Sequence, residues 1–209
     1  MNVNLKRART EANVKRLDEQ EKDAIKYCEA LACLVLRDEF GWDDEVWGTM
    51  RLKGFIRALY AWFAESFEQY RASGDAPFSR EIVPTVYAAL RNQVKALDVR
   101  AEKIEADYAF AEFFTGWKPE HMKERRAWRY KLLSEREMTF RAFWYLMMLY
   151  LHEKYGFGKS RLNKFYEICR RWYKTDFDLY LKCTVPDDER CRKMIRRVIE
   201  EAESLGVTL

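Results

Sequence analysis

Residues 149–165 read LYLHEKYGFGKSRLNKF, and a diverged copy of this stretch occurs earlier in the chain. The copy reads LVLRDEFGW at residues 34–42 and, after a short insertion, RLKGF at residues 51–55. The same register continues downstream, where Trp62 aligns with Trp172. The chain therefore reads as an internal duplication. Repeated units normally persist because each one buries its apolar face on a neighbour, so the repeated Leu, Phe and Trp positions are expected to be core.

Both copies favour helices. The chain has 209 residues but only eight Gly and four Pro, which leaves little material for the turns of an all-β fold. Apolar residues recur at a three-four spacing, which is typical of one buried helical face. We expect an all-α fold with two diverged copies of a helical-hairpin unit joined by a long helix. Residues 1–115 would hold the first copy with the long linking helix, and residues 116–209 the second copy.

Local signals give the expected ends of the helices. Gly41 and Gly156 are expected to end the two equivalent helices, since Gly adopts the left-handed conformation of a helix terminus at no steric cost. Ser134 and Glu137 have the spacing of a capping box and predict a helix start. Gly206 with Val207 fits a final C-cap. The predicted helices are residues 10–40, 51–71, 79–113, 134–155, 159–182 and 187–205.

Charge and cysteine content constrain the partner and the compartment. The net charge is +4 and the pI is about 8.7, which permits nucleic acid as a partner without requiring it. The five cysteines are odd in number and form no C-x-x-C pair, which favours reduced thiols in a cytoplasm. The N-terminus lacks the apolar region of a signal peptide. The most apolar run, residues 142–151, is too short to span a membrane and predicts a buried helix.

The sequence indicates no catalytic or metal site. Residues 156–160 read GFGKS, but the spacing of a phosphate-binding loop is missing and the string lies between two predicted helices. The two histidines, His121 and His152, do not form a metal-binding pair. We therefore expect a non-enzymatic protein without a cofactor or a metal.

Two groups of polar residues are candidates for binding a macromolecule. One follows the turn at Gly156, where the chain can be read as a helix-turn-helix with groove-facing side chains. The other is a basic and aromatic set whose cations would hold phosphates while its rings stack on bases. An alternative is that part of this charge forms ion pairs along the helix surfaces. The first group is Lys159, Ser160, Asn163 and Lys164; the second is Arg125, Arg126, Trp128, Arg129, Lys131, Arg170, Arg171 and Lys174.

The segment from His152 to Phe165, with its Tyr-Gly-Phe-Gly-Lys-x-Arg-Leu core, resembles small helical accessory proteins encoded by phages and prophages of Gram-positive bacteria. The resemblance covers about a quarter of the chain when the diverged first copy is left out. It implies an accessory phage protein that acts in the cytoplasm of a bacterial host cell. It brings no catalytic residues with it.

Two roles remain open at this point. One is direct binding of nucleic acid in phage regulation or replication. The other is inhibition of a bacterial defence system, as anti-CRISPR proteins do, by binding a host protein or nucleoprotein complex. Mild net charge with 15% aromatic residues suits a protein interface as well as a nucleic-acid surface. The sequence predicts no membrane partner and leaves a homodimer open.

Overall fold

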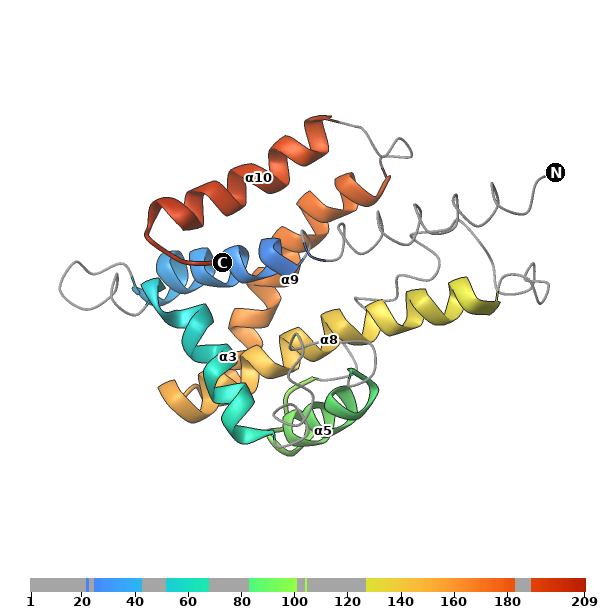
Figure 1. The fold of residues 1–209 in the computed structure, drawn as a ribbon. Helices are drawn as coiled ribbons and strands as arrows, with labels where there is room; N and C mark the ends of the chain where they lie inside the picture. The colour runs from blue at the N-terminus through green and yellow to red at the C-terminus, as the bar shows by residue number, and fades with distance from the viewer. Residues whose placement is uncertain are drawn as a thin grey trace.

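The computed structural model describes residues 22, 25–42, 52–67, 83–100, 104, 127–182 and 189–209. Side chains are described throughout these ranges except at residues 127–137, 173–182, 189–192 and 194. Within the described ranges the fold is all-helical, as the sequence predicted. The helices are residues 25–40, α3 (Phe55–Ser66), α5 (Val83–Ala96), α8 (Ala127–Tyr155), α9 (Lys159–Lys182) and α10 (Glu189–Ser204) (Figure 1).

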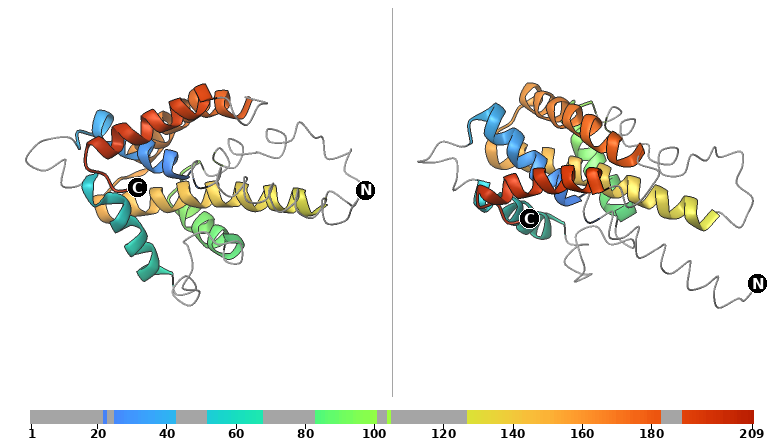
Figure 2. Two further views of the ribbon diagram at one scale, coloured as in Figure 1. Left: turned by 45° about the horizontal axis from the view of Figure 1, so that its top comes forward. Right: turned by 90° about the horizontal axis from the view of Figure 1, so that it is seen from above.

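Helix α8 is the central element of the fold. It lies between α10 on one side and α5 on the other, and α3 crosses close to its C-terminal end (Figures 1 and 2). All ten residues from 142 to 151 are buried, so every face of this part of the helix is covered by protein. A helix that is apolar all round is stable only inside a core or a membrane. The prediction of a buried helix here is confirmed, and no helix in the described ranges is long and apolar enough to cross a membrane.

The helix at residues 25–40 is buried in the same way. Residues 27–36 are all buried, and in the alignment of the two copies they correspond to residues 142–151. The buried apolar side chains of both helices belong to one continuous hydrophobic cluster, to which α3, α5, α9 and α10 also contribute. The described parts of both halves therefore share one core.

Three helices end at a left-handed glycine, as predicted. The φ angles are +67° at Gly41, +65° at Gly156 and +78° at Gly206. In each case the backbone N–H groups of the glycine and of the next residue bond back to carbonyls of the last helical turn. The residue after each glycine is apolar and buried: Trp42, Phe157 and Val207. These caps turn the chain back toward the core.

The predicted long linking helix is wrong. Helix α5 ends at Ala96, far short of residue 113, and Asp98 has a φ of +55°, which a right-handed helix does not allow. The N–H groups of Leu97 and Asp98 bond to carbonyls three residues back, which tightens the last turn. The Asp98 carboxylate then accepts a hydrogen bond from Lys159 of α9. A tertiary ion pair accompanies the break, and the sequence pattern alone did not show it.

Two other helix ends differ from the prediction. Helix α8 begins at Ala127, so Ser134 lies inside it and does not cap its start. The reason is that residues 127–133 consist largely of good helix formers and contain no breaker. Helix α3 ends at Ser66, because Phe67 becomes extended and its ring packs 5.0 Å from that of Phe63. The ends predicted for α9 and α10 agree with the structure to within two residues.

One repeated position does not lie in the core. Leu52 and Leu162 are fully buried, and so are Phe55 and Phe165, as the duplication predicts. The prediction that the repeated Trp positions are also core is wrong for the second copy. Trp62 is 6% exposed, whereas its counterpart, Trp172, is 52% exposed. The two aligned segments therefore present different surfaces at this position.

Candidate functional site

The structure places only part of the predicted basic and aromatic set. Arg125 and Arg126 lie outside the described residues. The backbones of Trp128, Arg129 and Lys131 belong to α8 and that of Lys174 to α9, but their side chains also lie outside the described part. The proposed grouping of these residues with Arg170 and Arg171 therefore stays a prediction.

The four residues after the Gly156 turn occupy the first turns of α9. Ser160 is exposed and Asn163 is half-buried. Lys159 forms an ion pair with Asp98, and the Lys164 Nζ lies 3.4 Å from a carboxylate oxygen of Glu39. Both lysine side chains remain more than half exposed, so the pairs are solvated and weak. They tie α9 to the turn after α5 and to the end of the helix at residues 25–40.

Further along α9, three consecutive residues differ in environment. Arg170 is half-buried, and its Nη1 lies 4.0 Å from a carboxylate oxygen of Glu167. Arg171 is exposed. Trp172 is the one large apolar side chain in the described part of the chain that is exposed. We call Ser160, Lys164, Arg171 and Trp172 the α9 surface.

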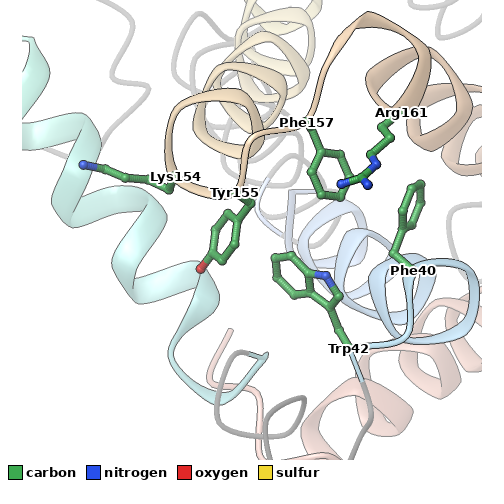
Figure 3. A pocket seen from close by; sticks show the side chains of 6 residues that line it. All are labelled: Phe40, Trp42, Lys154, Tyr155, Phe157 and Arg161. Atoms are coloured by element: carbon green, nitrogen blue, oxygen red, sulfur yellow. The ribbon is translucent and has the colours of Figure 1, made fainter.

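A second candidate site was not predicted. It is a cleft of about 650 Å³ at the junction of the two equivalent helix ends (Figure 3). Four aromatic side chains and two cationic side chains line it, which we call the aromatic cleft. The lining residues are Phe40, Trp42, Lys154, Tyr155, Phe157 and Arg161.

The two glycine caps hold the aromatic residues of the cleft in position. At each cap the N–H of the residue after the glycine bonds to a carbonyl six residues back, at 3.3 Å for Trp42 and 3.1 Å for Phe157. Nδ1 of His152 also donates a hydrogen bond to the Phe157 carbonyl, 2.9 Å away. Trp42 and Phe157 are nearly fully buried, while Phe40 and Tyr155 are half-buried. The cleft therefore has fixed, buried rings and partly exposed rings beside them.

The rings contact one another across the junction. The Phe40 and Phe157 ring centres are 5.1 Å apart, and those of Trp42 and Tyr155 are 4.6 Å apart. The rings are tilted in both pairs, a geometry that aromatic side chains favour. The Arg161 guanidinium lies 5.7 Å from the centre of the Phe157 ring. The packing links α8 and α9 to the helix at residues 25–40.

The electrostatics of the cleft favour an anion. None of its lining residues is acidic. Lys154 and Arg161 are exposed and have no ion pair with any residue in the described ranges, in contrast to Lys159 and Lys164. The first turn of α9 carries no acidic residue, so its unpaired N–H groups add positive potential next to Arg161.

The lining side chains supply rings for stacking and cations for charge pairing. Burial and the neighbouring Tyr155 raise the pKa of the Tyr150 phenol above its ordinary value. Across the residues that the structure describes, no three His, Cys, Asp or Glu side chains form a group that could hold a metal ion.

Sequence reasoning assigned the residues of the cleft to hairpin and core. A signal was present, because each copy carries an aromatic residue on both sides of its capping glycine: Phe40 and Trp42 in one, Tyr155 and Phe157 in the other. The sequence did not indicate that the two glycine turns lie next to each other in the fold. Comparisons with protein-family models, with curated proteins and with solved structures found no match.

Proposed function

We propose that this chain is a non-enzymatic binding protein that engages nucleic acid through the α9 surface. The observation that carries the proposal is the exposure of Trp172, which follows the exposed Arg171 in the sequence and lies about 100° from it around the helix. Leaving a large apolar side chain in water forgoes about 1.5 to 3 kcal/mol of burial free energy. A tryptophan next to a cation can recover that free energy by stacking on a base while the cation holds a phosphate.

Other residues of the α9 surface support the same role. Ser160, Lys164 and Arg171 are exposed and recur at intervals of four and seven residues, which places them along one side of the helix. The Lys164 pair with Glu39 is solvated, so a phosphate can replace the carboxylate at little cost. The sites would follow the helix axis, with Lys164 and Arg171 about 10 Å apart along it.

We also propose that the fold arose by duplication of one hairpin unit. The buried segments 27–36 and 142–151 align with each other, and the glycine caps that follow them have the same hydrogen bonds. In the alignment Phe40 corresponds to Tyr155, and Trp42 corresponds to Phe157. Replacing both residues of a contact by their counterparts gives another contact that is present in the structure. The contact between Phe40 and Phe157, at 5.1 Å, has its counterpart between Tyr155 and Trp42, at 4.6 Å.

A second exchanged pair supports the same relation. Phe55 corresponds to Phe165 in the alignment. The ring centres of Phe40 and Phe165 are 6.2 Å apart, and those of Tyr155 and Phe55 are 6.0 Å apart. Exchanged contacts of this kind are expected when two similar hairpins pack about an approximate two-fold axis. We infer that one hairpin unit was duplicated, and that Trp172 diverged afterwards toward a surface role.

The experiment is a titration of a fluorescent single-stranded oligonucleotide, read by anisotropy at several salt concentrations. Trp172→Ala should weaken binding about tenfold, because stacking contributes about 1 to 3 kcal/mol per base. Trp172→Phe should retain most of the affinity. Arg171→Gln should lower the slope of log affinity against log salt by about one.

A matched control is Arg57→Gln, which removes an exposed cation from α3 instead of α9. It should bind as tightly as the wild type. The proposal fails if the wild-type protein does not bind the strand, or if Trp172→Ala binds as tightly as the wild type.

The same exposed pair favours one alternative. Trp and Arg are the residue types that most often dominate the binding energy of protein interfaces. Trp172 with Arg171 would then engage a host protein or nucleoprotein complex, in the manner of a phage inhibitor of a bacterial defence system. A pull-down from bacterial lysate with and without nuclease separates the two roles. A protein partner that survives nuclease and is lost with Trp172→Ala would favour the alternative.

A further inference from the structure

The aromatic cleft consists of residues that the α9 surface does not use. Figure 3 shows the Arg161 guanidinium beside the Phe157 ring, and Lys154 beyond Tyr155 with its ammonium group directed away from the rings. Trp42 and Tyr155 lie between them in the same view. A ligand against the rings would therefore meet the Arg161 guanidinium at one end of the cleft.

Among the described residues, Lys164 near the cleft has an ion-pair partner, whereas Lys154 and Arg161 have none. Glu39, which adjoins the lining residue Phe40, already has Lys164 as its partner. The Lys164 Nζ also lies 5.3 Å from the centre of the Phe40 ring. Lys154 and Arg161 are left without a carboxylate partner in the described ranges, although both line the cleft. Among the described residues, no carboxylate therefore neutralises Arg161, whose guanidinium lies 5.7 Å from the centre of the Phe157 ring.

The volume of the aromatic cleft limits which ligands can fit it. A volume of about 650 Å³ lies in the middle of the range for small-molecule sites, about 300 to 1,000 Å³. It is larger than a single-ring carboxylate needs and suits a ring system joined to a second polar part. A guanidinium presents a planar fork of donors that matches the oxygens of a phosphate.

We propose that the aromatic cleft binds a nucleotide, with the base against the partly exposed rings of Phe40 and Tyr155 and the phosphate at Arg161. The same chemistry is offered by two sources: a free nucleotide, or an unpaired nucleotide at the phosphorylated end of a strand. The inference does not depend on the α9 surface, since the two sets share no residue.

The test is calorimetry and ligand-observed NMR with adenosine and uridine monophosphates. Adenosine, inorganic phosphate and benzoate serve as comparison ligands. The monophosphates should bind more tightly than any of the three. Arg161→Gln should weaken monophosphate binding about tenfold, the loss expected for one charge-assisted contact. Phe40→Leu should weaken both the monophosphates and adenosine, because it removes a ring from the wall.

Arg197→Gln is the matched control, because Arg197 is an exposed cation on α10 that does not line the cleft. It should bind like the wild type, and far-UV circular dichroism should be the same for every variant. The proposal is overturned if neither monophosphates nor 5′-phosphorylated strands bind the wild type, if benzoate binds as tightly, or if Arg161→Gln binds unchanged.

Oligonucleotides with and without a 5′-phosphate distinguish the two sources. If binding of the phosphorylated strand depends on Arg161, the ligand is the end of a strand. If only binding of the free monophosphate depends on Arg161, the ligand is a free nucleotide. Either outcome supports the cleft as a nucleotide site. Trp172→Ala separates this inference from the proposed function, because it should weaken binding along the strand and leave monophosphate binding unchanged.

Discussion

Replacing Gly156 by Ala should destabilise the protein by about 1 kcal/mol, and Gly41→Ala should do the same. The two glycines have φ angles of +65° and +67°, and a Cβ added to either would meet no atom within 4 Å. The whole cost is therefore backbone strain, about 1 to 2 kcal/mol for an L-residue in the left-handed region. Part of it, about 0.4 to 1 kcal/mol, is offset because Ala restricts the unfolded chain more than Gly does.

The measurement is urea unfolding followed by far-UV circular dichroism, together with a thermal melt. A loss of 1 kcal/mol corresponds to about 2 to 4 °C in a chain of this size. Gly156→Asn is the matched control, because Asn tolerates the left-handed region and should lose less than Ala. The reasoning is refuted if Gly156→Ala is as stable as the wild type, or if Asn costs as much as Ala.

Two further predictions concern buried polar groups. The pKa of Glu29 is raised above its ordinary value of 4.5, mainly by burial, although the hydrogen bond from Tyr60 lowers it in part. The folded state then holds a proton that the unfolded chain has lost, so the free energy of unfolding should fall as the pH rises above 4.5. Glu29→Gln should remove this fall in urea titrations across pH, and an unchanged pH profile would contradict it. Burial also raises the pKa of the thiols of Cys28, Cys33 and Cys169, so native protein should resist alkylation at all three, as mass spectrometry of the peptides would reveal. Rapid labelling of any of them before unfolding would show the packing to be wrong.

Helix content and most helix ends in the described ranges were predictable because their causes are local. Gly41, Gly156 and Gly206 cap helices through their own backbone freedom, which any sequence context would preserve. The burial of residues 142–151 follows from their composition alone. The end of α5 was not predictable in this way. Its last turn is followed by Asp98, whose carboxylate contacts Lys159, a partner far along the chain.

For the candidate sites too, some properties belong to single residues and others depend on contacts between distant elements. Charge and aromatic character follow from residue type, so Arg171 and Lys164 could be predicted as candidates for binding from the sequence. Ion pairing depends on distances between elements, so the fold was needed to show that Lys159 and Lys164 face carboxylates while Arg161 faces none in the described ranges.

The difference in burial between Trp62 and Trp172 also depends on contacts between elements. Trp62 and Trp172 occupy matching positions in the sequence alignment. Burial depends on what packs against a side chain, and Trp62 lies against Tyr150 whereas Trp172 stays exposed. In the same way, the aromatic residues around Gly41 and Gly156 form a cleft only because two hairpins bring distant turns together. Periodicity along one helix carries no information about that meeting.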